Sequence, residues 1–390
     1  MKKLADNILS WCNSPEEGAI KQAQNISKHP CLVGNVCLMP DTHEGYGMPI
    51  GGVAALKDAV CPNMVGVDIG CGMLAVKTSL KGISKEQILS IIGGTKEHKG
   101  GIKSRIPVGF KHHKKEQNSP IFDKERWKQC PICLQEFQSA KLQLGTLGGG
   151  NHFIEIQKDQ DNYIWFMIHS GSRNLGYKIA KHYNKVAENF CKQFKQDEVV
   201  KTELAFLPKG TEAFNNYWNE MNLCLEFAYY NRKAMSNIIK EEMRRVIPDI
   251  QFIQEINIHH NYASIENHYG QNVYVHRKGA TLARENTIGI IPGSQGTNSY
   301  IVNGLGNAAS MYSCSHGAGR KLSRRKAIDT LDLEYEQKIL NDKGVIHSLN
   351  CKNSLDEAAG AYKNINNVME EQKDLVKIIV TLTPLAVVKG

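Results

Sequence analysis

Clusters of glycine that interrupt short hydrophobic runs are the feature that most restricts how this chain can fold. The clusters lie at 45–52, 66–72, 145–150, 171–176, 293–296 and 317–319. Each adjoins a short apolar run of strand character, such as MLAVKT, YIWFMIH or IGIIPG. Many short strands that end in glycine-rich polar turns predict a β-rich core with functional loops.

Helices are predicted between these strands. The sequence favours helices at 83–92, 174–195, 212–246 and 355–373, and one that begins near an N-cap at Ser323. Strands and helices do not alternate strictly, so we predict an α+β fold rather than a doubly wound sheet. No linker divides the chain, and we expect residues 1–390 to form a single large domain with a β-rich mixed core flanked by helices. The segment 103–135, rich in Lys, His, Pro and Gln, is interpreted as an insertion or a substrate-facing loop.

The composition excludes several protein classes. Hydrophobic residues make up 41% of the 390 residues, enough for a packed core. No apolar run approaches the roughly 20 residues that span a bilayer, and MKKLADNILSWCNS lacks the apolar centre of a signal peptide. We therefore expect a cytoplasmic protein without a membrane partner. The 11 cysteines are an odd number, which argues against a disulfide framework, and Cys130–Cys133 has no second CxxC to complete a zinc site.

The net charge of +9 favours a polyanionic partner. Basic residues concentrate at 103–115 and at 320–326. Such runs are usually solvated surface, but the second begins four residues after His316, a histidine in an unusual setting.

The histidines stand in polar, glycine-rich surroundings. Six of eight such segments contain histidine: PDTHEGYGMPIGG, GGGNHFIEI, HSGSRNLG, INIHHNYA, HRKGAT and SCSHGAGR, while GVDIGCGM and PGSQGT do not. A structural role would be expected for any one of these histidines alone. For all six segments together, a functional site is the better interpretation.

A metal centre is predicted around Asp68 and Cys71, which lie three residues apart in a glycine turn. His152, His169 and the pair His259–His260 add imidazoles. Oxygen, sulfur and nitrogen donors together suit a divalent ion such as Mn²⁺ or Zn²⁺. These donors exceed what one zinc ion needs, so two ions that share the cysteine would use them naturally. The alternatives are an Asx-turn for Asp68 and a small buried hydrophobe for Cys71.

Phosphate sites are predicted at the glycine turns. LGGGNH, HSGSR and PGSQGT expose backbone N–H groups that can bind phosphate, although no Walker A sequence occurs. In SCSHGAGRKLSRRKA, His316 precedes a basic run that we predict to be helical, so its imidazole would lie near a helix N-terminus that favours phosphate. Arg320 would add a bidentate contact. His316 can then attack a phosphoryl group, unless it simply caps the helix.

Over residues 36 to 390 the chain resembles the RtcB family of RNA ligases. The resemblance rests on nine ordered motifs: PDTHEGYGMPIGG, GVDIGCGM, GGGNHFIEI, HSGSRNLG, HHNYA, HRKGA, PGSQGT, SCSHGAGR and the terminal VVKG. It implies the α+β fold of that family, two Mn²⁺ ions and GTP as cofactors.

The resemblance also implies roles for individual residues. The metal ligands would be Asp68, Cys71, His152, His169 and His260, with Cys71 bridging both ions, and His316 would be the nucleophile that takes GMP from GTP. The nucleotide pocket would comprise Asn151 at the phosphate, Glu155 and Lys389 at guanine, Tyr362 stacked on guanine, and Ser294, Ser299, Gly317, Ala318 and Gly319 as its lining. Arg173 and Arg277 would contact phosphate or RNA.

The reaction implied by the resemblance joins an RNA 3′-phosphate or 2′,3′-cyclic phosphate to a 5′-hydroxyl through a histidine–GMP intermediate. Fragments of tRNA or ribosomal RNA, in splicing or in repair, would be the substrates. The family also suggests a monomer, and an activating accessory protein as a partner.

Three positions depart from the usual family pattern. Gly70 stands where Asn is usual, Asn174 where Gly is common, and Gln295 where PGSMG has Met. None removes a predicted ligand or the nucleophile. Two other functions fit part of the pattern: a dinuclear-metal phosphoesterase acting on RNA ends, which would not require His316 or VVKG, and a non-catalytic RNA-binding protein, which would not require the metal donors.

Overall fold

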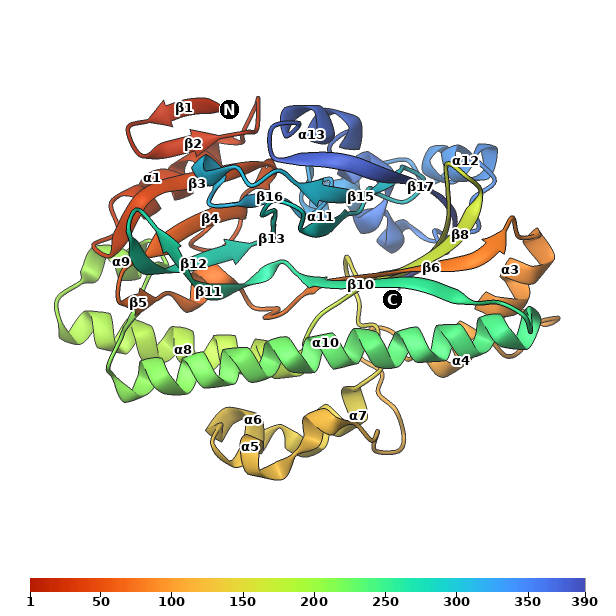
Figure 1. Ribbon diagram of the computed structural model, residues 1–390, viewed down its shortest axis with the longest axis horizontal. Helices are drawn as coiled ribbons and strands as arrows, with labels where there is room; N and C mark the ends of the chain where they lie inside the picture. Colours follow the sequence, from red (N-terminus) through yellow and green to blue (C-terminus); the bar gives the residue numbers. More distant parts are fainter. Residues whose placement is uncertain (390) are drawn as a thin grey trace.

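Two large β-sheets form the centre of the computed structural model, which describes residues 1–389, and the two longest helices run along one side of them (Figure 1). In sheet order, the first sheet contains β1 (Lys2–Ala5), β2 (Ile8–Ser10), β3 (Leu32–His43), β4 (Ile50–Leu56), β12 (Gln271–Lys278) and β11 (Asn261–His268). The second contains β10 (Phe252–His259), β6 (Gly72–Lys81), β8 (Tyr163–Ser170), β7 (Phe153–Asp159), β17 (Val376–Lys389), β15 (Ser299–Gly304) and β14 (Ile288–Ile291). Two short ladders pair β13 (Ala280–Leu282) with β16 (Ser313–Ser315), and β5 (Ala59–Val60) with β9 (Leu207–Pro208).

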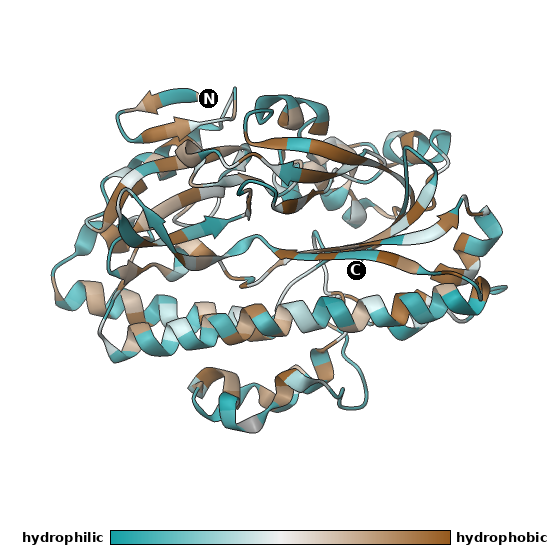
Figure 2. Ribbon diagram, viewed as in Figure 1, coloured by the Kyte–Doolittle hydropathy of each residue, from teal (hydrophilic) through white to brown (hydrophobic). Residues whose placement is uncertain are grey.

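Every neighbouring pair in the second sheet is antiparallel, and β2–β3 is the parallel pair of the first sheet. Strand β6 is buried on both faces because its alternate residues enter different cores. Leu74 and Val76 pack toward α3 (Lys85–Ile92) and α10 (Glu212–Val246), whereas Met73 and Ala75 pack in a cluster with residues of β14 and β15. Figure 2 shows mostly hydrophobic colour along β17, and an alternation of hydrophobic and hydrophilic residues along β10 and α10.

The helices begin and end where local chemistry dictates. Thr211 caps α10 by accepting a hydrogen bond from the N–H of Phe214, and the helix ends before Pro248. The other helices are α1 (Glu17–Ser27), α2 (Pro62–Val65), α4 (Ile102–Arg105), α5 (Lys124–Lys128), α6 (Pro131–Gln135), α7 (Phe137–Gln143), α8 (Arg173–Gln193), α9 (Asp197–Lys201), α11 (Arg324–Thr330), α12 (Leu333–Asp342) and α13 (Ile365–Glu371). Short 3₁₀ turns are η1 (Pro120–Phe122), η2 (Ala308–Ser310), η3 (Lys352–Glu357) and η4 (Ala359–Ala361).

The predicted α+β class with a β-rich core is confirmed, as are the helices at 83–92, 174–195 and 212–246 and the N-cap at Ser323. The predicted helical stretch over 355–373 is confirmed for α13 and wrong for the residues before it. This stretch forms the end of η3, then η4, an extended Tyr362 and only then α13. The assignment of residues 1–390 to one domain stays a prediction. Within residues 1–389, no helix combines the length and the hydrophobicity needed to span a membrane.

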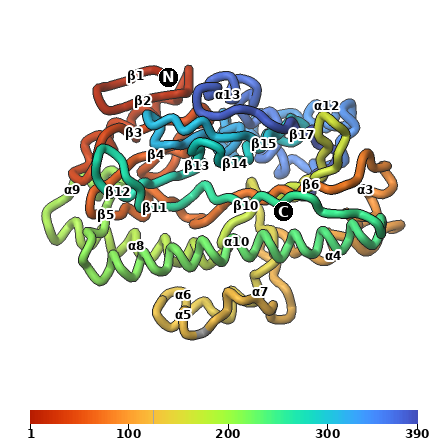
Figure 3. The backbone as a smooth tube through the Cα atoms, in the orientation of Figure 1, coloured from red at the N-terminus to blue at the C-terminus, as the bar shows by residue number. Residues whose placement is uncertain are grey.

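The segment 103–135 divides into two parts. Residues 120–135 contribute η1, α5 and α6, which with α7 lie on the side of α10 away from the sheets (Figure 3). Residues 107–118 form a loop whose start pairs with the glycine turn at Gly148. For residues 107–118, a role as a substrate-facing loop stays a prediction.

Candidate active site

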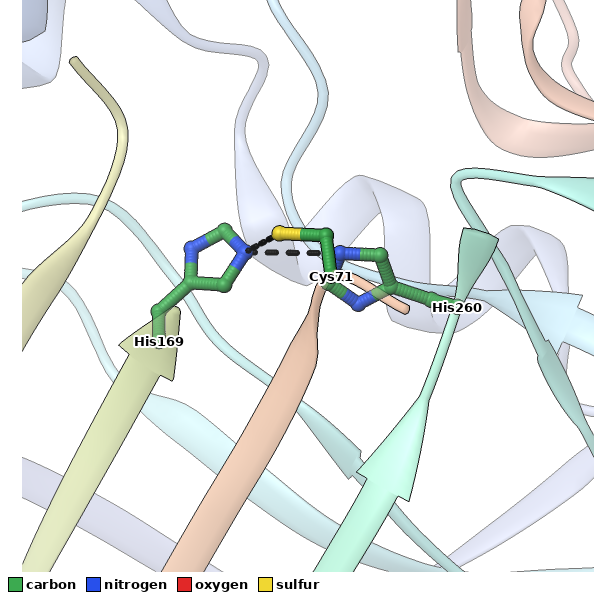
Figure 4. A group of neighbouring side chains, drawn as sticks. All are labelled: Cys71, His169 and His260. Carbon is green, nitrogen blue, oxygen red and sulfur yellow. Dashed lines mark hydrogen bonds between the residues drawn. The ribbon is translucent and has the colours of Figure 1, made fainter. Parts of the chain in front are cut away.

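One edge of the second sheet brings the predicted metal ligands together. Because β6 is antiparallel to both of its neighbours, its first residue, Gly72, lies opposite Ser170 at the end of β8 and His259 at the end of β10. Cys71, His169 and His260 therefore meet although they are far apart in the sequence (Figure 4).

The donors form two sets that share the thiol of Cys71. In one, the Cys71 Sγ lies 3.3 Å from the His169 Nε2, which lies 3.3 Å from the His260 Nε2. In the other, the Cys71 Sγ lies 3.5 Å from the His152 Nε2, which is 3.0 Å from the Asp68 Oδ2. This is the shared-cysteine arrangement that the residue types suggested.

Main-chain carbonyls orient two of the imidazoles. The Nδ1 of His152 donates to the carbonyl of Leu147 at 2.8 Å, and the Nδ1 of His169 donates to that of Asn151 at 3.1 Å. With Nδ1 carrying the proton, each Nε2 presents its lone pair to the Cys71 thiol. This assignment of protons follows from the hydrogen-bond partners. Such carbonyl-oriented imidazoles are typical of metal-binding histidines.

The electrostatics of the cluster fit a cationic ligand. Burial, together with the Asp68 carboxylate, raises the pKa of the Cys71 thiol well above its ordinary value. Burial lowers the pKa of His169 and of His260 well below the ordinary value, so both rings stay neutral. A carboxylate, a thiol and three imidazoles, nearly all buried, are a donor set that one or two divalent cations would satisfy.

His316 lies at the same place, supplied by the turn after β16. Its ring centroid is 4.7 Å from that of His260. Its Nδ1 donates to the Asp41 Oδ2 at 2.6 Å, and the same oxygen accepts the main-chain N–H of His316 at 3.1 Å. Asp41 is fully buried. The carboxylate therefore fixes the orientation of the ring. In the neutral imidazole it keeps the proton on Nδ1 and leaves the lone pair on Nε2, the form in which an imidazole can act as a nucleophile.

A cavity of about 350 Å³ opens beside His316 and the donor cluster. Of the predicted site residues, its lining contains Asp68, Cys71, Asn151, Glu155, His169, His260, Ser294, His316, Gly317, Ala318, Gly319, Tyr362 and Lys389. His152 lies behind Cys71 and reaches the cluster without lining the cavity. Ser299 is buried, and its Oγ accepts the N–H of Gly293, so it supports the loop from beneath.

The far end of the cavity is strongly polar. Burial raises the pKa of Glu155 to about 8. The Glu357 carboxylate forms ion pairs with the Lys389 Nζ at 2.8 Å and the Arg324 Nη1 at 2.7 Å. It also accepts a hydrogen bond from the Tyr362 hydroxyl. Burial alone would raise the pKa of Glu357, but Lys389 and Arg324 hold it below its ordinary value.

The family model of the tRNA-splicing ligase RtcB matches residues 22–129 and 121–390. The chain belongs to the RtcB family. It is 37% identical, over 96% of its length and 95% of the relative, to the RNA-splicing ligase RtcB1 of an Escherichia coli strain, and 36% identical over the same shares to RtcB of Escherichia coli K12. The tRNA-splicing ligase RtcB of Nanoarchaeum equitans is 31% identical over 96% of this chain and 92% of its own.

Two cationic residues of this RtcB family chain do not have the roles that the sequence suggested. Arg277 is completely buried, where Glu266 and the Met311 carbonyl hold its guanidinium, so it cannot contact RNA. Arg320 is occupied by Glu357 and the Asp356 carbonyl rather than free for a bidentate phosphate contact.

His316 is also not at a helix N-terminus, because α11 begins only at Arg324. The turn Gly317–Gly319 follows it instead and lines the same cavity. Two other histidines of the highlighted segments are structural. His276 accepts the N–H of Cys61 in the core, and His259 lies against Arg232.

The three departures from the RtcB pattern have local explanations. Gly70 has φ +74°, a conformation that glycine and asparagine both adopt, so the turn that carries Asp68 and Cys71 keeps its shape. The side chain of Asn174 donates to Glu136 at 3.1 Å and ties α8 to the α6–α7 junction. Gln295 donates to the Glu357 carbonyl at 2.8 Å and ties the PGSQGT loop to η3.

Asp41, His43, Arg324 and Glu357 also belong to the site, but no individual role was predicted for them. Asp41 and His43 lie in the segment PDTHEG, which is one of the histidine segments described above. An aspartate two residues before a histidine in that segment could have indicated that both belong to the site. We find no comparable signal for Glu357.

Proposed function

We propose that this member of the RtcB family is an RNA ligase that uses GTP and Mn²⁺ to join a 3′-phosphate or 2′,3′-cyclic phosphate end to a 5′-hydroxyl end. The observation that carries the proposal is the pairing of His316 with buried Asp41 beside two donor sets that share Cys71. The names of the relatives, RNA-splicing and tRNA-splicing ligases, support the same class of substrate.

His316 is the nucleophile of the first step. Its Nε2 lone pair attacks the α-phosphorus of GTP, the bond from that phosphorus to the bridging oxygen breaks, and pyrophosphate leaves. The ring becomes cationic as the N–P bond forms, while Nδ1 keeps its proton and its hydrogen bond to Asp41. A fixed negative charge at that position stabilises the developing positive charge, without reorganisation.

The donors Asp68, Cys71, His152, His169 and His260 would hold two Mn²⁺ ions. When bound, such ions neutralise charge on phosphate oxygens. The turn Gly317–Gly319 and Asn151 would bind phosphate. Glu155 and Lys389 would contact guanine, with Tyr362 beside it.

Two further transfers complete the reaction. A 3′-phosphate oxygen of the RNA attacks the guanylyl phosphorus, which breaks the N–P bond and frees His316. The 5′-hydroxyl then attacks the RNA 3′-phosphate and releases GMP, leaving a phosphodiester. A 2′,3′-cyclic phosphate is first hydrolysed to a 3′-phosphate in the same site. Fragments of tRNA or ribosomal RNA are the substrates, in splicing or repair, and the protein acts in the cytoplasm as a monomer, with an activating accessory protein where one is required.

The proposal is tested by covalent labelling. Purified protein is incubated with α-³²P-labelled GTP, with and without Mn²⁺, and compared with His316→Ala and with His182→Ala, an exposed histidine of α8 that serves as control. We expect an Mn²⁺-dependent label that His182→Ala keeps and His316→Ala loses. A metal-loaded wild type that releases phosphate from RNA ends without any label would instead establish the phosphoesterase.

A further inference from the structure

An aromatic side chain stands free in solvent at the edge of the active site. Phe110 is 98% exposed, more than any other large hydrophobic residue among those described. A phenylalanine in water gains nothing for folding, so its place at the tip of a loop needs another explanation.

Hydrogen bonds anchor the backbone of the turn that carries Phe110. The N–H of Lys111 donates to the Val108 carbonyl at 3.2 Å and closes a tight turn, in which Gly109 adopts φ +63°. The Gly109 N–H donates to Gly148 at 2.8 Å, and the Gly109 carbonyl accepts from Arg173 at 2.7 Å. The turn is therefore anchored on both sides, and only its tip projects.

The surroundings of Phe110 are cationic. Lys111, Lys114 and Lys115 follow it and are exposed, and none of them takes part in an ion pair among the described residues. His113 fixes the run to the body of the protein, since its N–H donates to the Leu142 carbonyl at 3.0 Å. An aromatic ring within a basic loop is the combination that binds single-stranded nucleic acid, where the ring stacks on a base and the cations follow the phosphates.

The loop adjoins the catalytic centre. The partner of Gly109, Gly148, belongs to the turn that continues into Asn151 and His152. Arg173 connects this loop to the donor cluster, because it donates a hydrogen bond to the Gly109 carbonyl and its charge interacts with the Asp68 carboxylate. Phe110 itself does not line the cavity beside His316.

We infer that Phe110 is a stacking platform for an unpaired base of the RNA end that enters the active site, with Lys111, Lys114 and Lys115 beside the phosphates. This inference rests on the proposed function for the identity of the RNA but not for the stacking contact itself. It assigns a binding role to a residue outside the reaction chemistry.

The test measures RNA affinity. Fluorescence anisotropy would report binding of a fluorescein-labelled single-stranded oligoribonucleotide with a 3′-phosphate to the wild type, Phe110→Ala, Phe110→Trp and the control Phe194→Ala. Phe194 is also exposed, at 59%, but lies at the end of α8. We expect about ten-fold weaker binding for Phe110→Ala, wild-type affinity or better for Phe110→Trp, and no change for Phe194→Ala.

A second probe separates stacking from backbone contact. An oligonucleotide of the same length without bases should bind equally to the wild type and Phe110→Ala. Equal affinity of these two proteins for the intact strand would overturn the inference, as would a loss that persists with the abasic strand or a Phe110→Trp variant as weak as Phe110→Ala.

Labelling by GTP in the absence of RNA keeps the two proposals apart. We expect Phe110→Ala to be guanylylated as fast as the wild type. If the wild type takes no label, the ligase mechanism fails, yet the ten-fold affinity difference would still establish the stacking platform.

Discussion

Replacing Asp41 by asparagine tests the proposed nucleophile without removing it. The hydrogen bond from His316 Nδ1 spans 2.6 Å, and Asp41 is fully buried, so the charge lost by Asp41→Asn acts at short range in a poorly hydrated place. For opposite charges about 4 Å apart at an effective dielectric constant of about 20, the interaction is about 4 kcal/mol. Because each 1.36 kcal/mol changes a rate about ten-fold, we expect guanylylation to slow by about 10³-fold.

The assay is single-turnover formation of labelled protein at saturating GTP. The reduction should lie in the rate of labelling, with little change in the GTP concentration that gives half-maximal rate, because Asp41 bonds His316 and does not line the cavity. Asp159→Asn is the matched control: Asp159 is also buried, but it bonds Trp165 and the β7–β8 turn. A loss of less than ten-fold in Asp41→Asn, or an equal loss in the control, would refute the role assigned to Asp41.

Three further results are expected. Cys71→Ser should bind Mn²⁺ more than about 100-fold more weakly in calorimetry, since it removes the donor shared by both sets; wild-type affinity would show that Cys71 is no ligand. The affinity for GTP should rise about ten-fold from pH 6 to pH 7, since Glu155, with a pKa of about 8, must ionise to accept the guanine N–H groups; Glu155→Gln should bind weakly at every pH. Burial lowers the pKa of His29 from 6.5 to about 4. Between these two pH values the unfolded chain binds more protons at His29 than the folded chain does, so the free energy of unfolding should fall by about 3 kcal/mol as the pH falls from 6.5 to 4. Urea unfolding of His29→Gln should depend less steeply on pH there, and an unchanged slope would contradict this.

Local sequence predicted the elements of the fold better than their arrangement. The helix at 212–246 could be bounded from its cap and from Pro248, and the glycine turns marked the strand ends. The first part of 355–373 was not predicted correctly, because side-chain contacts replace helical hydrogen bonds there. The Gly360 N–H donates to Glu336 of α12, and Glu357 pairs with Tyr362 and Lys389. The order of the strands could not be predicted, since β17 pairs with β7 more than 200 residues away and periodicity carries no information about partners.

The site shows the same division. Residue types and spacing predicted the side chains that meet in the donor cluster, because few other combinations of Asp, Cys and His have a common use. They did not predict that Asp41 meets His316, 275 positions later, or that Glu357 would gather Arg320, Arg324 and Lys389. Two arginines illustrate why. The family resemblance implied a phosphate or RNA contact for both Arg173 and Arg277, but Arg277 is buried in an ion pair with Glu266 and is therefore structural.

Asn261 explains how the two sheets hold one active site. It begins β11, directly after the ligand His260. Its main-chain carbonyl accepts the N–H of Gly70 at 2.8 Å, and its side-chain amide donates to the Asp68 carbonyl at 3.1 Å. Asn261 therefore holds the turn that carries Asp68 and Cys71 at two points. Its amide oxygen accepts the N–H of Gly279, whose Cβ, if it had one, would lie 3.0 Å from the His316 ring. Asn261 therefore ties the turn that carries Asp68 to the chain beside His316. A Cβ at position 279 would also lie 2.4 Å from the Ile50 side chain, so a side chain there would displace Ile50 first and would crowd His316.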